Sequence, residues 1–162
     1  MKCNSITPFL WFDTEAEDAA KFYTSIFDNS TIDDVSRYGE AGPREAGSVM
    51  TVSFTLCGQR FVGLNGGPQY KFSEAVSFSI ECETQEEVDF FWERLTSGGG
   101  EPGPCGWLRD KFGMSWQVVP AALPELLTSD DREGAGRAMA AMMEMSKLDI
   151  NELRRAYEGS PA

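Results

Sequence analysis

Residues 75–95 read AVSFSIECETQEEVDFFWERL, and this stretch predicts a strand followed by a helix. The alternating pattern over residues 75–82 is typical of a strand with one covered face. Thr84 is placed to cap the helix, and two glutamates follow in its electropositive first turn. Apolar residues then recur at helical spacing, as Val88, Phe91, Trp92 and Leu95.

The same pattern occurs once before, over residues 6–27. A short apolar strand is expected at 6–12, with Asp13 or Thr14 as the cap of the helix that follows. The apolar stripe of this helix is Ala19, Phe22, Tyr23 and Ile26, and each residue lies 69 positions before its counterpart in the later helix. The same shift places Thr7, Phe9 and Trp11 on Val76, Phe78 and Ile80. We therefore predict an internal duplication.

Further strands complete each copy. They are predicted at 31–38, 48–57 and 60–65 in the first copy, and at 106–110 and 114–119 in the second. Each copy is then read as a βαβββ module, with the remaining strand of the second copy falling around residues 100–112, and the fold class is α+β. The expected divisions are a first module at 1–70, a second module at 71–121 and a helical tail at 122–162, within one compact domain of 162 residues.

The tail differs from the modules because its signals are helical. Pro124 is expected early in a short helix, and Asp130 with Glu133 and Asp149 with Glu152 resemble capping boxes. Residues 138–145 contain four methionines. Methionine packs adaptably, so this run is expected to cover the body or a second subunit, and the alternative is a flexible lid over a pocket.

Composition excludes several classes of function. The chain has no histidine, which excludes a His-dependent triad, an imidazole base and His metal ligands. With 14 basic and 26 acidic residues the net charge is −12, so nucleic acid and anionic membranes are not expected partners. The four scattered cysteines, which lack a C-x-x-C pair, are expected to be reduced. The N-terminal residues lack a signal-peptide core, so a cytoplasmic location is expected.

The paired βαβββ pattern resembles the vicinal oxygen chelate superfamily, which includes glyoxalases, bleomycin-resistance proteins and extradiol dioxygenases. Residues 7–12 (TPFLWF), 22–27 (FYTSIF) and 105–120 (CGWLRDKFGMSWQVVP) resemble its PhnB-like branch, often labelled 3-demethylubiquinone-9 3-methyltransferase. The resemblance extends over about residues 5–157. It implies that the modules form a curved mixed sheet around a cavity, and that the protein is a homodimer, in some members with exchanged modules.

The resemblance also locates the metal positions of the superfamily. Relatives that use a metal carry a His or Glu ligand at four places, which fall near Pro8, Val62, Ser77 and Gln117 in this sequence. None of these is a histidine or a carboxylate, and the Gln117 amide oxygen is a weak ligand for such a cation. We therefore expect neither a metal ion nor another cofactor.

Strand alternation predicts which side chains replace the metal. Phe9, Trp11, Val76, Phe78, Ile80 and Trp116 share one parity and are expected beneath the helices. Serine, threonine and glutamine occupy the opposite parity, which the resemblance makes the cavity face. The expected ligand-binding residues are Ser53, Thr55, Asn65, Ser77, Trp107, Ser115 and Gln117.

These features favour a metal-independent protein that binds a small, partly aromatic molecule, neutral or cationic rather than anionic. The alternative is an enzyme of the same fold, a lyase, isomerase or dioxygenase, with Asp110 or Glu81 as base and Cys105 or Cys57 as nucleophile. The methyl transfer that the label of the PhnB-like branch suggests is less favoured. The glycines at 66–67 follow a strand without a helix after them, and those at 98–100 follow a helix, whereas nucleotide-type donors use a strand–glycine–helix loop.

Overall fold

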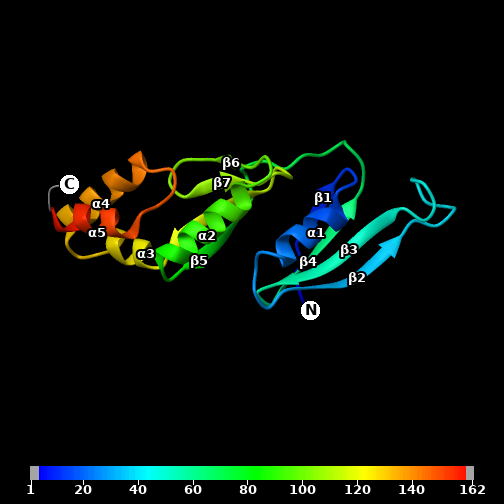
Figure 1. Cartoon of the computed structure of the whole chain (residues 1–162), viewed down its shortest axis with the longest axis horizontal. Coiled ribbons are helices and arrows are strands. Elements are labelled where there is room, and N and C mark those ends of the chain that lie inside the picture. Colours follow the sequence, from blue (N-terminus) through cyan, green and yellow to red (C-terminus); the bar gives the residue numbers. More distant parts are fainter. Residues whose placement is uncertain (1–3, 160–162) are drawn as a thin grey trace. The chain divides into compact units, whose positions relative to one another are not determined.

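The computed structural model describes residues 4–159, which form eight strands and five helices (Figure 1). The chain divides between Phe72 and Ser73 into two units, each with its own sheet. The first unit contains β1 (Phe9–Phe12), α1 (Ala16–Thr24), β2 (Thr31–Arg37), β3 (Val49–Leu56) and β4 (Gln59–Asn65). The second contains β5 (Ser77–Cys82), α2 (Gln85–Thr96), β6 (Glu101–Pro102), β7 (Trp107–Arg109) and β8 (Ser115–Pro120), followed by α3 (Ala122–Leu127), α4 (Arg132–Glu144) and α5 (Ile150–Glu158).

The two sheets have the same topology. The strand order is β1-β4-β3-β2 in the first and β5-β8-β7-β6 in the second. In each sheet the first and last strands of the module pair in parallel, and the other pairs are antiparallel. The predicted α+β class, the paired βαβββ modules and the helical tail are therefore confirmed.

Each module helix packs on one face of its own sheet. In α1 the buried residues include Ala16 and Tyr23, whose ring lies 6.1 Å from that of Phe54 on β3. In α2 they are Val88, Trp92 and Leu95, and the Thr84 side chain forms a complete capping box with Glu87. Helical spacing thus identified most of both buried stripes, whereas the predicted stripe residues Phe22 and Phe91 are half-buried and Ile26 is buried just after α1 ends.

The predicted parity of the first strand is wrong. Leu10 and Phe12 are buried beneath α1, at 5% and 4% exposure, whereas Phe9 is 64% exposed and Trp11 is half-buried on the other face. A side chain at Gly63, the cross-strand neighbour of Leu10, would touch Ala16 of α1, which identifies the helix-covered face. Both faces of β1 are apolar, so alternation could not choose between them.

The repeat is consequently not a uniform shift of 69. At the end of the first strand of each module, the carbonyl of Phe12 accepts from the Gly66 N–H and that of Cys82 accepts from the Ala121 N–H. Phe12 and Cys82 are therefore equivalent, and they lie 70 residues apart. The helices begin at Ala16 and Gln85, a shift of 69. The strand–helix connection is one residue shorter in the second module, and this changes the parity of the strand. Of the remaining core predictions, Trp116 is buried, Phe78 contacts it and Ile80 is half-buried, but Val76 is 64% exposed before β5 begins.

The tail packs on the second unit. Leu123, Met145, Leu148 and Leu153 form a hydrophobic cluster. The Gln85 side chain fastens the tail to α2, because its Nε2 donates to the Leu148 carbonyl at 3.1 Å and its Oε1 accepts from the Ile150 N–H at 2.9 Å. Within residues 4–159, no helix is long and apolar enough to cross a membrane.

The tail differs from its prediction at one helix cap and in the burial of its methionines. Asp149 caps α5 as expected, but α4 is capped by Asp131, whose Oδ1 accepts from the Gly134 N–H, rather than by Asp130. In the methionine run, Met145 is buried while Met139 and Met143 are 43% and 59% exposed. Packing on the body therefore accounts for part of the run.

Candidate functional site

We call the sheet face opposite the module helix the open face. In the second unit it carries a polar pair, because Gln117 Nε2 donates a hydrogen bond to Ser77 Oγ at 2.9 Å. Trp107 lies directly across from Gln117 on the neighbouring strand, and Ser115 lies across from both Ser77 and Arg109. Four of the seven predicted ligand-binding residues, Ser77, Trp107, Ser115 and Gln117, thus come together on one face.

Ser53 and Thr55 lie on the open face of the first unit. Ser53 is the cross-strand neighbour of Val62, which in turn pairs with Phe9. Thr55 Oγ1 donates to Asp33 Oδ2 at 2.9 Å, on the edge strand β2. This face mixes hydroxyls with the exposed ring of Phe9, which suits an amphipathic molecule.

The metal positions of the superfamily do not fit a cation in this chain. Because Asn65 and Pro120 end equivalent strands, Val62 corresponds to Gln117, and Val62 is apolar. Pro8 falls one residue away from Phe9, the open-face neighbour of Val62. At Ser77 and Gln117 the donors are a neutral hydroxyl and an amide that already bond each other. Over residues 4–159, no group of three or more His, Cys, Asp or Glu side chains is placed to hold a metal ion.

Next to the polar pair, the second unit contains a pocket of about 460 Å³ between β6, β7 and the turn at 103–105. Its wall includes Trp107 and Ser115 and three ionic side chains that the sequence did not single out. Arg109 pairs with Glu101 and, at 3.6 Å, with Glu74. Arg109 could have been identified from the sequence, because it lies two residues after Trp107 on one strand and therefore on the same face. No comparable sequence pattern identifies Glu74 or Glu101.

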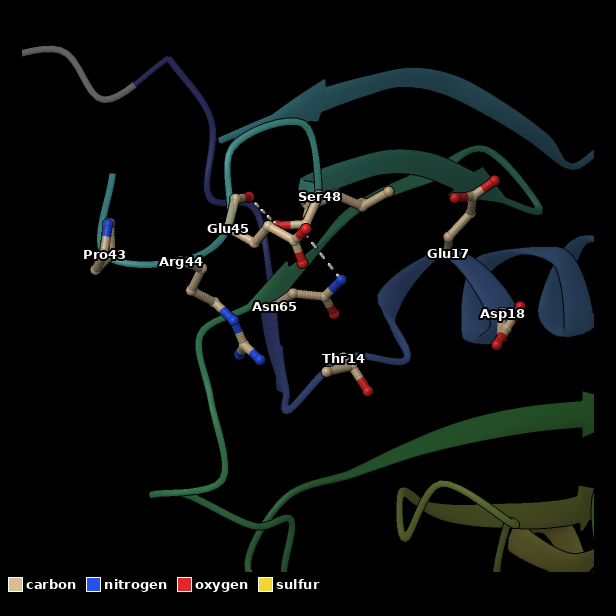
Figure 2. Close-up of a pocket in the computed structure, with 9 residues that line it drawn as sticks. Thr14, Glu17, Asp18, Pro43, Arg44, Glu45, Ser48 and Asn65 are labelled. Atoms are coloured by element: carbon tan, nitrogen blue, oxygen red, sulfur yellow. Dashed lines mark hydrogen bonds between the residues drawn. The ribbon is translucent and has the colours of Figure 1, made fainter. Parts of the chain in front are cut away.

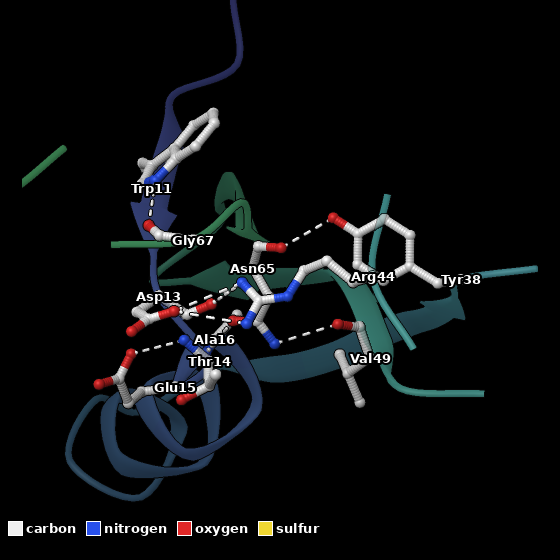
Figure 3. A network of polar contacts seen from close by, with 10 residues as sticks. All are labelled: Trp11, Asp13, Thr14, Glu15, Ala16, Tyr38, Arg44, Val49, Asn65 and Gly67. Atoms are coloured by element: carbon white, nitrogen blue, oxygen red, sulfur yellow. Dashed lines mark hydrogen bonds and ion pairs between the residues drawn. The ribbon is translucent and has the colours of Figure 1, made fainter. Parts of the chain in front are cut away.

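Asn65, one of the predicted ligand-binding residues, has a structural role in the first unit. It is 5% exposed, and its Oδ1 accepts the Ala16 N–H at 2.8 Å while its Nδ2 donates to the Val49 carbonyl at 3.1 Å. The capping position of α1 is Glu15, which makes no side-chain capping bond, so Asn65 supplies the missing acceptor from a distant strand (Figure 3). The predicted caps Asp13 and Thr14 do not cap the helix.

A second pocket, of about 470 Å³, opens beside this network in the first unit. Figure 2 shows Asn65 lying between the start of α1 and the loop that carries Arg44, Glu45 and Ser48. Arg44 closes one side, because its guanidinium donates to the backbone carbonyl of Asp13 at 2.6 Å. Three polar groups of Asn65 already have partners. Its Oδ1 accepts from α1, its Nδ2 donates to β3, and its backbone carbonyl accepts from the Tyr38 hydroxyl.

The residues considered for catalysis either lie on separate parts of the chain or already have hydrogen-bond partners. Asp110 is 3% exposed, and its carboxylate accepts from Phe112 N–H, Met114 N–H and Trp116 Nε1 at 2.9, 3.0 and 2.9 Å. It therefore organises the β7–β8 turn, as its sequence context favours. Glu81 and Cys57 are exposed and belong to different units.

Cys105 lines the pocket of the second unit and contacts the Met143 sulfur at 3.8 Å. Its backbone adopts φ +55°, and its N–H donates to the Met145 carbonyl at 2.8 Å. The turn at 103–105 is thereby fastened to the tail. The described cysteines Cys57, Cys82 and Cys105 are free thiols, as predicted, and Cys3 lies outside the described residues.

The thiols should differ in reactivity. Burial raises the pKa of Cys82 to about 12, and the nearby carboxylates of Glu87 and Glu81 add to this effect. Because the thiolate is the reactive form, we expect Cys82 to resist iodoacetamide at pH 8 while exposed Cys57 is alkylated. Peptide mass spectrometry measures this, with protein alkylated in denaturant as the control. Equal labelling of Cys82 and Cys57 in the native protein would contradict the burial.

Comparison with known proteins supports this fold. The family model described as 3-demethylubiquinone-9 3-methyltransferase matches residues 4–119. A PhnB protein from Bacillus cereus is 39% identical, with a TM-score of 0.65 over 73% of this chain and 100% of that chain. Fosfomycin resistance proteins FosX from Mesorhizobium loti and Listeria monocytogenes are 13% and 16% identical, with TM-scores of 0.56 and 0.52 over 80% and 77% of this chain and 100% and 98% of theirs. No curated protein sequence matches this chain.

Proposed function

This chain belongs to the 3-demethylubiquinone-9 3-methyltransferase family, a PhnB-like branch of the vicinal oxygen chelate superfamily, and we propose that it binds a small organic molecule without a metal ion. The ligand lies on the open face of the second unit. There Ser77, Trp107, Ser115 and Gln117 present hydroxyl, amide and indole groups toward the same surface. A homodimer and a cytoplasmic location are part of the same proposal.

The observation that carries this proposal is the hydrogen bond from Gln117 Nε2 to Ser77 Oγ. It joins two strands at positions where metal-using relatives have ligands, and it replaces ionic donors by a neutral pair. The bond leaves the Gln117 amide oxygen as an acceptor and the Ser77 hydroxyl hydrogen as a donor. A neutral donor and acceptor beside an indole ring are what an uncharged polar group on an aromatic ligand requires.

Native mass spectrometry of untagged protein tests the proposal, because a histidine tag would add the metal ligands that the chain lacks. We expect no stoichiometric divalent ion and a small organic adduct that survives buffer exchange. The variant Gln117→Leu keeps the side-chain size but removes the amide, and it should weaken the affinity for the adduct about tenfold, as the loss of one good hydrogen bond does, so that adduct occupancy falls.

Gln59→Leu is the matched control, since Gln59 is an exposed amide at the start of β4 in the first unit. It should leave the adduct unchanged. A divalent ion bound at one per chain would overturn metal independence. Equal adduct occupancy in the Gln117→Leu and unsubstituted proteins would show that the ligand does not bind on this face.

The family description itself names a methyltransferase, which makes methyl transfer the second candidate function. The glycines at 66–67 follow β4 and lead to the unit boundary, and those at 98–100 end α2, so neither forms the strand–glycine–helix loop of a nucleotide site. The native spectrum recorded with added S-adenosylmethionine distinguishes the two functions. A stoichiometric complex with this methyl donor would favour transfer over binding.

A further inference from the structure

The pocket between β6, β7 and the turn at 103–105 contains a buried polar atom that the protein does not satisfy. Ser115 is 1% exposed, and within the described chain its Oγ has no hydrogen-bond partner. Ser115 is among the residues that line the pocket. Ser77, its neighbour on β5, already accepts from Gln117. Because buried hydroxyls are normally hydrogen-bonded, Ser115 Oγ is positioned to accept from a molecule in the pocket.

The ionic groups of the pocket carry a surplus negative charge. Two carboxylates, Glu74 and Glu101, share the one guanidinium of Arg109. The pair with Glu101 is close and hydrogen-bonded, whereas Glu74 Oε1 lies 3.6 Å from Arg109 Nη1, and the Glu74 side chain is 69% exposed. Glu74 can therefore take a second cation without breaking the Arg109–Glu101 pair, and an anion would meet two carboxylates there.

The remaining wall is apolar and firmly held. The half-buried Trp107 and two prolines, Pro102 and Pro104, line the pocket. Two hydrogen bonds anchor the turn at 103–105 and its next residue to the tail. The Gly106 N–H donates to the Ser146 carbonyl at 2.7 Å, and Ser146 Oγ donates to the Gly103 carbonyl at 2.6 Å. A preformed wall with an indole ring favours flat ligands, and the ring face attracts cations.

We propose that this pocket selects a small, flat organic cation with two or more N–H donors, such as an amidine. One N–H bonds the Glu74 carboxylate, a second bonds Ser115 Oγ, and the flat body packs on Trp107. This assignment rests on the proposed function, because it names the ligand class for the same open face of the second unit.

Two shape-matched probes of opposite charge test the proposal. Benzamidine and benzoate are titrated into the full chain, with chemical-shift changes in the NMR spectrum as the readout. We expect benzamidine to bind at least tenfold more tightly than benzoate and to shift the resonances of Trp107 and Ser115. Glu74→Gln removes the surplus charge and should reduce this preference about fivefold, in keeping with one charge near the surface.

Ser115→Ala removes the acceptor and should weaken benzamidine several-fold. Ser97→Ala is its control, because Ser97 is the C-cap residue after α2 and is not among the residues that line the pocket. Should Ser115→Ala fail to fold, Glu74→Gln carries the test, since Glu74 is exposed.

Benzoate binding as tightly as benzamidine would overturn the cation assignment, as would an unchanged preference in Glu74→Gln. If neither probe binds while the purified protein carries an organic adduct sensitive to Gln117→Leu, the cation assignment fails and the proposed function stands. If neither probe binds and no adduct is present, both fail.

Discussion

Replacing Asp110 by alanine is expected to lower the free energy of unfolding by about 3–4 kcal/mol. The substitution removes the acceptor for three N–H groups, of which those on Met114 and Trp116 belong to buried residues. A buried donor that loses its partner costs about 1–3 kcal/mol. Urea denaturation followed by circular dichroism measures the change.

The Asp110→Asn variant is the matched comparison, because its amide retains one acceptor oxygen of the same size. We expect a loss between those of the unsubstituted protein and Asp110→Ala. Wild-type stability of Asp110→Ala would contradict the structural role of the carboxylate. If that stable variant also lost a measured turnover, Asp110 would return as a catalytic base.

Asn65→Ala is expected to destabilise the protein by about 2–3 kcal/mol. It removes the acceptor of the buried Ala16 N–H and the donor to the Val49 carbonyl, so the first turn of α1 loses the side-chain acceptor that replaces a cap at Glu15. The same denaturation experiment measures this loss, and reduced helical signal should accompany it.

Asn151→Ala is the control for this substitution, since Asn151 is an exposed asparagine on α5. Its effect should remain below about 0.5 kcal/mol, as for ordinary surface substitutions. A stable Asn65→Ala variant with altered ligand binding would show that the sequence-based assignment of Asn65 to the ligand was correct.

Most secondary structure was predictable because its signals are local. The apolar spacing of Val88, Trp92 and Leu95 identifies the buried face of α2, and Thr84 and Asp149 are side chains that cap the helices directly after them. The duplication was also visible, since both helices repeat the same stripe. The stripes and caps depend on residues within about two helical turns of each other, and the duplication follows from comparing two such local patterns.

The first strand shows where local pattern fails. Phe9, Leu10, Trp11 and Phe12 are all apolar, so only the packing of α1 over Leu10 and Phe12 determines which face is covered. The connection that is one residue shorter in the second module then reverses the parity that a uniform repeat predicts. A difference of one residue has this effect because side chains in a strand alternate with a period of two.

The candidate site divides in the same way. Sequence alternation alone placed Ser77, Ser115 and Gln117 on one face, because they occupy matching positions of regular strands. The Gln117–Ser77 bond, the unpaired Ser115 hydroxyl and the shared Arg109 guanidinium depend on strand register and on chain segments that meet in space. Asn65 belongs to this second group, since it caps a helix that begins 49 residues earlier. Composition and alternation thus determined the chemical character of the face, and tertiary packing decided which of its groups bond each other and which remain for a ligand.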